Sequence, residues 1–375
     1  MTQRATVVGA GIAGLTSAIA LAESGYEAVV LDRAAGPSDA PLGLAITGNG
    51  LEALAAIGLR GEVERAGVTT RMGSILTDAG TTLMAKTQTG AGYIVGIREG
   101  TLLRILAERA DDLGVETRRE TLVRSDADLP ETDLVVGADG LRSTVRRWIK
   151  PRVQPDYSGA ACWFGISDAL ESTPEFVTSW VGRGTEAGIL PLDNGAFWYI
   201  SAIDRQRGPS TAGDDAAAAE AAQLGALFEA PLSAHISATT SGTVTRQPLF
   251  YLPTGLPRFT STRTGMPTLL VGDAAHAMVP SLVQGANQTF EDAAVLRVLL
   301  RDEPDTETLF ARFNEERVQR AQRMQVRSWR AIRWMQATHP VTGAIRNAVL
   351  KLTPTMAAEI LTDWHGRWVS PDAPR

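Results

Sequence analysis

Cysteine is nearly absent from the sequence: the 375 residues include one, Cys162. A single cysteine excludes a disulfide within the chain and any metal site built from several cysteines, and it is typical of a reducing compartment. The four histidines are widely separated, so no metal cluster is indicated and we expect no bound metal. Cys162 itself is expected to be a small core residue.

Long apolar runs are missing as well. No run of about 18 apolar residues occurs, so the sequence predicts no membrane-spanning helix. The net charge of −6 disfavours binding to nucleic acid or to an anionic membrane surface. No secretory signal peptide is indicated, because the first expected strand begins almost directly after Met1, and we therefore expect a cytoplasmic protein.

At its beginning the chain contains a strand–helix–strand unit with a glycine-rich turn. The apolar residues 5–8 predict a buried parallel strand, and Gly9, Gly11 and Gly14 follow with the spacing Gly-x-Gly-x-x-Gly. These glycines allow a tight turn, close approach of a pyrophosphate to the backbone, and close packing of helix on strand. A second strand ends at Asp32, whose carboxylate can accept hydrogen bonds from both ribose hydroxyls. The unit predicts a dinucleotide site but does not identify the dinucleotide.

Two later stretches repeat this order of strand, turn and helix. Residues 133–137 predict a buried strand, followed by an Asp-Gly turn at residues 139–140 and a helix. Residues 268–271 predict another strand, followed by a Gly-Asp turn at residues 272–273, a loop, and a long helix after Gly285. Because α/β folds keep ligands at the carboxyl ends of their strands, both turns are candidate ligand contacts.

The rest of the chain shows other patterns. Between the two later stretches, residues 160–203 predict successive strands joined by glycine-containing turns, which indicates an antiparallel sheet. We also expect a hairpin at residues 73–85, a short strand at residues 121–124, and Asn49 as the N-cap of a helix. Residues 310–334 predict a long helix.

Three separated junctions are more than a nicotinamide dehydrogenase needs, because such an enzyme normally completes its nucleotide site within one contiguous domain. Together the three motifs resemble those of the FAD-dependent aromatic hydroxylases, the single-component flavoprotein monooxygenases typified by para-hydroxybenzoate hydroxylase. In length and layout the chain is closer to the urate- and salicylate-hydroxylase-like members and to the tetracycline-modifying monooxygenases. The resemblance covers essentially the whole chain.

The resemblance implies an α/β fold with a Rossmann-like FAD-binding domain, an interleaved antiparallel-sheet substrate domain and C-terminal helices. The FAD-binding domain would comprise residues 1–72, 93–155 and 258–310. The substrate domain would comprise residues 73–92 and 156–257, and the C-terminal helical region residues 311–375.

FAD is the cofactor that the resemblance implies. Asp32 would bind the adenosine ribose and Asp273 a ribityl hydroxyl, and the helix after Gly285 would point its electropositive N-terminus at the flavin pyrimidine edge. The implied cofactor contacts are Gly9, Gly11, Ile12, Ala13, Gly14, Asp32, Arg33, Ala45, Arg98, Leu122, Asp139, Gly140, Asp273, Gly285, Ala286 and Asn287.

The implied reaction is an NADH- or NADPH-driven monooxygenation in which a flavin C4a-hydroperoxide transfers one oxygen atom from O2 to a small aromatic or polycyclic substrate. The chemistry is the flavin's, so no side chain is assigned as catalytic. Trp163, Trp198, Tyr199 and Pro280 are the candidate substrate contacts, and aromatic core packing is an equal alternative for the first three. Glu186 stands near the place of the substrate-binding arginine of urate-hydroxylase-like members, which favours a neutral, fairly apolar substrate.

Two features leave alternatives open. Val283 stands where the family usually has glycine, and a β-branched residue resists a positive φ, so we expect a different loop or restricted flavin movement. His276 is interpreted as a general base or as a residue that fixes the Gly-Asp loop. A flavin-dependent halogenase or reductase on the same fold, and a non-catalytic flavin- or drug-binding protein, are the alternative functions.

Overall fold

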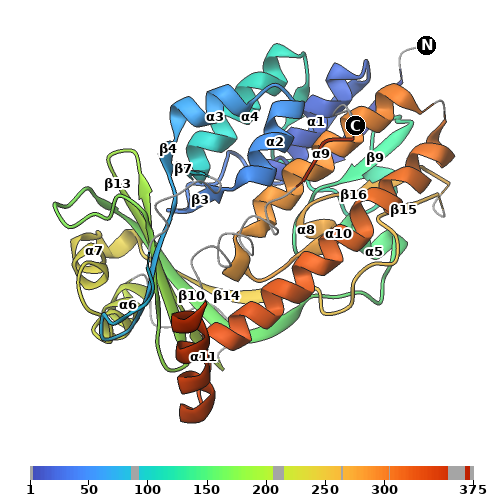
Figure 1. The fold of residues 1–375 in the computed structure, drawn as a ribbon. Coiled ribbons are helices and arrows are strands. Elements are labelled where there is room, and N and C mark those ends of the chain that lie inside the picture. The colour runs from blue at the N-terminus through green and yellow to red at the C-terminus, as the bar shows by residue number, and fades with distance from the viewer. Residues whose placement is uncertain are drawn as a thin grey trace.

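The structure is a computed structural model that describes residues 3–85, 93–205, 215–262, 265–303, 305–353 and 368–371. Two large sheets lie in separate parts of the molecule, and long helices run between and beside them (Figure 1). In the part of the chain that the structure describes, no helix is long and apolar enough to cross a membrane.

The first sheet contains the glycine-rich junctions. Its strand order is β15-β16-β9-β1-β2-β8; the five strands from β16 to β8 run parallel to one another, and β15 pairs antiparallel with β16. The strands are β1 (Arg4–Val8), β2 (Glu27–Leu31), β8 (Glu116–Arg118), β9 (Leu134–Gly137), β15 (Thr260–Ser261) and β16 (Thr268–Leu270). The apolar residues of these strands and of the neighbouring helices form one buried core. The helices are α1 (Ile12–Glu23), α4 (Glu99–Asp112), α5 (Thr144–Ile149), α8 (Asp273–His276) and α9 (Gln284–Asp302).

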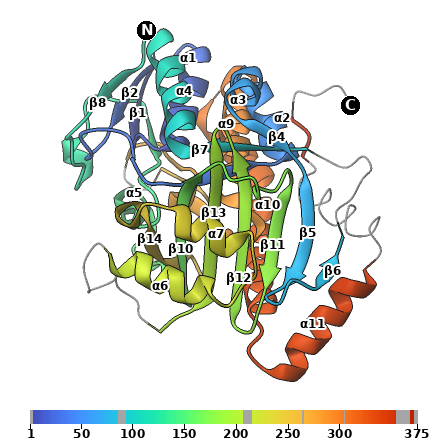
Figure 2. The same cartoon turned by 90° about the vertical axis from the view of Figure 1, so that its left-hand side faces the viewer.

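The second sheet has seven strands in the order β14-β10-β13-β12-β11-β5-β6 and is mostly antiparallel. Its outer face is covered by α6 (Ala216–Gly225) and α7 (Leu232–Ala238), and its inner face lies toward α10 (Thr306–Met335) (Figures 1 and 2). The strands are β5 (Met72–Thr77), β6 (Thr82–Met84), β10 (Asp156–Asp168), β11 (Val177–Val181), β12 (Thr185–Leu192), β13 (Gly195–Ile203) and β14 (Thr245–Tyr251).

A small third sheet, β3-β7-β4, lies between the two large ones. It consists of β3 (Gly43–Ile46), β4 (Val68–Thr70) and β7 (Ile94–Arg98), and β4 continues almost directly into β5 of the second sheet. The helices α2 (Gly48–Ala56) and α3 (Arg60–Ala66) separate β3 from β4, and α11 (Pro340–Leu352) packs against β6. The short 3-10 turns are η1 (Asp126–Asp128), η2 (Ser241–Thr243) and η3 (Pro280–Leu282).

The structure corrects two local predictions. Asn49 is not an N-cap: Thr47 precedes α2, and the Asn49 side chain is fully buried, with its amide donating to Gln284 and Glu291. Residues 121–124 form no strand. The hairpin of β5 and β6 is confirmed, with a positive φ of 75° at Gly80 in its turn.

Candidate cofactor and substrate site

The three strand–turn–helix junctions meet at one edge of the first sheet. Because β1, β9 and β16 are parallel neighbours, their carboxyl ends lie side by side. Backbone hydrogen bonds join the turns: Gly9 N donates to Leu31 O at 2.8 Å, Ala138 N to Val8 O at 2.9 Å, and Val271 N to Gly137 O at 3.1 Å. Segments that are far apart in the sequence therefore form one continuous surface.

The glycines of the first junction leave room at its centre. Gly9 has a φ of 106°, and a Cβ there would lie 2.5 Å from Ala138 O. A Cβ at Gly14 would lie 1.7 Å from Gly9 O, so the helix can approach the strand only without a side chain. A Cβ at Gly11 would meet no atom within 4 Å, so this residue, the N-cap of α1, borders open space. Ile12 and Ala13 form the first turn of α1 beside that space.

Asp32 follows β2 and braces the same turn. Its Oδ2 accepts from Ala10 N at 2.5 Å and its Oδ1 from Ala34 N at 2.7 Å. Arg33 is exposed next to it, and the half-exposed Leu122 lies close by because Thr121 N donates to Asp32 O at 2.8 Å. The adenosine-side candidates therefore gather at the end of β2.

Asp139 and Gly140 form the second turn, directly beside the first. Asp139 Oδ2 accepts from Thr144 N at 2.5 Å and Val145 N at 3.2 Å, which caps α5. Its Oδ1 is buried and has no hydrogen-bond partner among the described residues. Gly140 has a φ of 75°, and a Cβ there would meet no atom within 4 Å. An unpaired carboxylate oxygen next to open space is suited to accept a ligand hydroxyl or an ordered water.

Asp273 follows Gly272 in the third turn and is the first residue of α8. Its side chain is accessible to solvent, although protein atoms surround it closely enough that desolvation raises the pKa of its carboxyl. The buried guanidinium of Arg146 holds the turn from below: Nη1 donates to Ala274 O at 3.0 Å and Nη2 to Leu141 O at 2.6 Å. Arg146 was not predicted as a site residue from the sequence, where it is one of two arginines in a short helix.

The N-terminus of α9 is tied to the third sheet. Asn287 Oδ1 accepts from Thr47 N at 3.0 Å, and its Nδ2 donates to Ala45 O at 3.0 Å. Ala45 is thereby brought to the first turn of α9, next to Ala286. A Cβ at Gly285 would meet no atom within 4 Å. The first backbone N–H groups of a helix have no intrahelical partner, so this turn offers free donors to a ligand.

Val283 adopts a left-handed backbone conformation, which the sequence analysis considered unfavourable for a β-branched residue. Its φ is 57° and its ψ 24°, and its carbonyl accepts from Asn287 Nδ2 at 2.6 Å. The loop therefore keeps a geometry suited to glycine with a β-branched residue, at a steric cost of about 1–2 kcal/mol. The Val283 side chain is 45% exposed, so little packing offsets that cost.

We expect Val283→Gly to raise the free energy of unfolding by about 1 kcal/mol, because relief of the left-handed strain exceeds the added entropy of the unfolded chain. Val283→Ala, which removes only the branch, should lie between glycine and valine. Urea denaturation of the three proteins measures the order. A glycine variant less stable than the wild type would show that Val283 contributes packing that outweighs its strain.

These groups fit FAD by their chemistry. The glycine turn at Gly11 would hold the pyrophosphate, Asp32 the ribose, and Asp273 a ribityl hydroxyl, while the first turn of α9 would meet the flavin ring. When bound, FAD supplies the redox chemistry, and the protein supplies binding, orientation and electrostatics.

Behind the third turn lies a buried network of charged side chains, which the sequence analysis missed. Arg317 of α10 donates through Nε to Asp292 Oδ1 at 2.8 Å and through Nη1 to Glu291. Asp292 Oδ2 accepts from Gly272 N at 2.9 Å and contacts His276 Nε2 at 2.7 Å. All four side chains are fully buried. His276 therefore braces the Gly-Asp turn. In the sequence, this network could have been recognised from the adjacent acids Glu291 and Asp292, which lie within an otherwise apolar stretch of the predicted helix.

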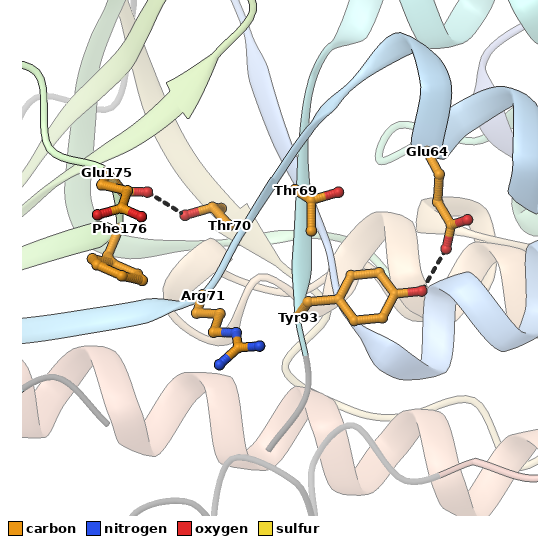
Figure 3. A pocket seen from close by; sticks show the side chains of 7 residues that line it. All are labelled: Glu64, Thr69, Thr70, Arg71, Tyr93, Glu175 and Phe176. Atoms are coloured by element: carbon orange, nitrogen blue, oxygen red, sulfur yellow. Dashed lines mark hydrogen bonds between the residues drawn. The ribbon is translucent and has the colours of Figure 1, made fainter. Parts of the chain in front are cut away.

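Arg98 is the N-cap of α4. Its Nη2 is 3.4 Å from Asp193 O in the turn between β12 and β13, and it borders an open cleft of about 500 Å³ with Asp168 and Thr101. Another open pocket, of about 550 Å³, lies where β4 passes into β5 (Figure 3). There Tyr93 donates to Glu64 at 2.5 Å and Thr70 to Glu175 O at 2.9 Å. It contains none of the residues predicted for the site.

The aromatic substrate candidates lie on opposite faces of the second sheet. Trp163 and Trp198 are on the outer face under α6 and α7, where their indole N–H groups donate to Glu220 and Thr239 at 2.8 and 2.7 Å. Because alternate residues of a strand point to opposite faces, Tyr199 is on the inner face. The two tryptophans are core residues, which corrects their assignment as substrate contacts. Tyr199 packs in the inner-face cluster with Ala45, and the exposed Pro280 begins η3 nearby.

The fold and the site together define a flavoprotein, and comparison with known proteins agrees. A family model described as an FAD binding domain matches residues 2–131 and 130–328. Aurachin C monooxygenase/isomerase from Stigmatella aurantiaca is 31% identical over 334 residues, which cover 84% of this chain and 85% of that protein. 3-Amino-4-hydroxybenzoate 2-monooxygenase from Streptomyces cremeus is 32% identical over 319 residues, covering 78% and 77%.

The fold has a solved counterpart. Klebsiella pneumoniae HpxO, complexed with FAD and uric acid, superimposes with a TM-score of 0.84 at 20% sequence identity, covering 97% of this chain and 96% of the other. The chain belongs to the FAD-binding aromatic hydroxylase family and is an FAD-dependent monooxygenase. The predicted fold class, cofactor and enzyme class are thereby confirmed.

Proposed function

We propose that this protein uses NADH or NADPH to insert one atom of O2 into a small aromatic or polycyclic compound, by hydroxylation or epoxidation. The observation that carries the proposal is the meeting of three junctions at one sheet edge, opposite the apolar inner face of the second sheet. Relatives named for aurachin C, 3-amino-4-hydroxybenzoate and 2-heptyl-3-hydroxy-4(1H)-quinolone support an aromatic or heteroaromatic substrate.

In this proposal the three junctions bind different parts of FAD. Gly9, Gly11 and Gly14 bind the pyrophosphate, with Ile12 and Ala13 beside it, and Asp32 binds the adenosine ribose. Asp139 and Gly140 close the pyrophosphate side, and Asp273 orients the ribityl chain. The remaining proposed contacts are Arg33, Ala45, Arg98, Leu122, Gly285, Ala286 and Asn287.

The helix α9 supplies the electrostatic part of the proposal. Its N-terminus carries a partial positive charge and free N–H groups, which would stabilise negative charge on the pyrimidine side of a bound flavin. Tyr199 and Pro280 would border the substrate. The chain would then divide as its sheets do, with FAD-binding residues 1–72, 93–155 and 258–310, substrate-binding residues 73–92 and 156–257, and C-terminal helices in 311–375.

Isotope labelling tests the proposal. The purified, FAD-loaded protein is screened for NADH and NADPH consumption with a panel of phenols and polyketides, and the best substrate is then converted under ¹⁸O2. We expect one ¹⁸O atom in each product molecule, detected by mass spectrometry. An unlabelled product from a verified substrate, or purified protein that takes up no FAD, would contradict the proposal.

A further inference from the structure

The inner face of the second sheet carries an acidic side chain, Glu186, among apolar neighbours. Residues of β12 alternate between the two faces: Ala187 and Ile189 belong to the outer cluster, and Leu190 to the inner one. Glu186 therefore shares the inner face with Leu190 and with Tyr199 of the adjacent strand β13. Only 7% of Glu186 is exposed. A buried carboxylate in such surroundings is costly unless its oxygens are paired.

Among the described residues, only one of the two carboxylate oxygens of Glu186 has hydrogen-bond partners. Oε1 of Glu186 accepts from Ser281 Oγ at 2.8 Å and lies 3.5 Å from Gln336 Nε2. Oε2 accepts no hydrogen bond from any residue in the described ranges. Gln336 in turn donates to Ser201 Oγ at 2.7 Å, so the protein holds the carboxylate in one orientation while leaving one oxygen available.

The position of Glu186 relates it to the site. Ser281 lies in η3, two residues before Val283, which is the N-cap of α9. The ring of Tyr199 lies over Gly188, where a Cβ would be 2.5 Å from Tyr199 Cε1. Glu186 thus stands between the loop that leads to the proposed flavin contact and an aromatic ring on the inner face.

We infer that Glu186 is the substrate-recognition residue, and that its Oε2 accepts a hydrogen bond from a hydroxyl or ring N–H group on the aromatic substrate. This inference rests on the proposed function. During the reaction the O–H or N–H bond breaks, its proton moves to Oε2, and its electron pair stays on the substrate, which makes the ring more electron-rich. No further oxidant or reductant is needed for this step. A substrate carboxylate at the same place would be repelled.

The protonation behaviour of the group suits a base. Burial raises the pKa of Glu186 to about 7, although its bonds to Ser281 and Gln336 oppose that shift. Burial also raises the pKa values of Cys162 and Tyr199, which face Glu186 from β10 and β13, so both stay neutral near pH 7. Among these facing groups, Glu186 is the one that changes charge in the neutral range.

A matched pair of probes tests the inference: 2-naphthol carries the hydroxyl and 2-naphthoate the carboxylate on the same ring system. Binding to the FAD-loaded protein is measured by the change in flavin absorbance. We expect the wild type to prefer 2-naphthol, Glu186→Gln to lose about 10-fold in 2-naphthol affinity, and Glu186→Arg to prefer 2-naphthoate. Glu171→Gln, which alters an exposed carboxylate before β11, is the control and should change neither affinity.

The pH dependence of 2-naphthol affinity provides a second readout. Affinity of the wild type for 2-naphthol should fall several-fold as the pH drops from about 8 to about 5.5, because the carboxylate is protonated, and Glu186→Gln should show no such fall. An unchanged preference in FAD-loaded Glu186→Gln, together with a flat wild-type profile, would overturn the inference. Failure of the wild type to bind FAD would instead contradict the proposed function, so the two failures are distinguishable.

Discussion

Replacing Gly14 by alanine is expected to destabilise the fold by about 3 kcal/mol or more, because the new Cβ would overlap backbone that cannot move aside. The Cβ would lie 1.7 Å from Gly9 O and 2.8 Å from Gly9 C, and the turn at Gly9 is itself fixed against Ala138. Relief of the overlap requires α1 to move away from β1, which opens the core of the first sheet. Urea denaturation and FAD content would both report the loss.

The same substitution at Gly11 should separate folding from cofactor binding. A Cβ at Gly11 meets no protein atom within 4 Å, so Gly11→Ala should unfold at nearly the wild-type urea concentration. The methyl group would occupy space assigned to the pyrophosphate and weaken its hydrogen bonds to the backbone, so FAD affinity should fall about 100-fold.

Gly36→Ala is the control for both variants, because its Cβ would also meet nothing within 4 Å and lies in the loop after β2. It should leave both stability and FAD affinity unchanged. A Gly11→Ala variant that keeps its FAD would show that the pyrophosphate does not lie at this turn. A stable Gly14→Ala variant would show that α1 can shift at little cost.

The junctions could be predicted from the sequence because their signals are local. A short apolar strand, a glycine or aspartate turn and an amphipathic helix follow one another within a few residues at Gly9, Asp139 and Asp273. Parallel strands then place their carboxyl ends at one edge, so the convergence follows from sheet topology. The left-handed conformation at Val283 could not be predicted, because a β-branched residue resists a positive φ.

Features that depend on distant partners could not be predicted. Alternation along β13 separates Trp198 from Tyr199, but it does not tell which face meets helices α6 and α7. Asparagine is a common N-cap residue, yet the Asn49 side-chain amide donates a hydrogen bond to Glu291 of α9, 242 positions away. Arg317 lies on the long helix α10, and its burial depends on acids contributed by α9. Tertiary contacts decide each of these positions.

Replacing Arg317 by methionine is expected to lower the free energy of unfolding by about 3–5 kcal/mol, because it removes the buried cation that Asp292 and Glu291 share. Asp292 and Glu291 both bind this guanidinium, and Gln288 accepts from Arg317 Nη2 through its backbone and side-chain oxygens at 3.0 Å. The FAD site should weaken too, since Asp292 holds Gly272 N at 2.9 Å. Urea denaturation with and without FAD measures both effects.

Arg320→Met is the matched control, since Arg320 binds the same Glu291 but is 23% exposed on its side chain. Its partly solvated pair should cost about 1 kcal/mol. Equal losses in the free energy of unfolding for the two variants would show that the contribution of Arg317 to stability does not depend on its depth of burial.

The pH dependence of the free energy of unfolding tests whether Arg317 acts through its charge. Burial alone would raise the pKa of Asp292, but His276 and Arg317 outweigh it and hold that pKa below its usual value. A carboxyl with a lowered pKa stabilises the fold above its unfolded pKa, and this contribution is lost as the pH falls through the folded value. In Arg317→Met much of that contribution is already missing, so the deficit relative to the wild type should be largest near neutral pH and shrink in acid. A deficit that grows on acidification would mean that Arg317 acts mainly by packing rather than by its charge.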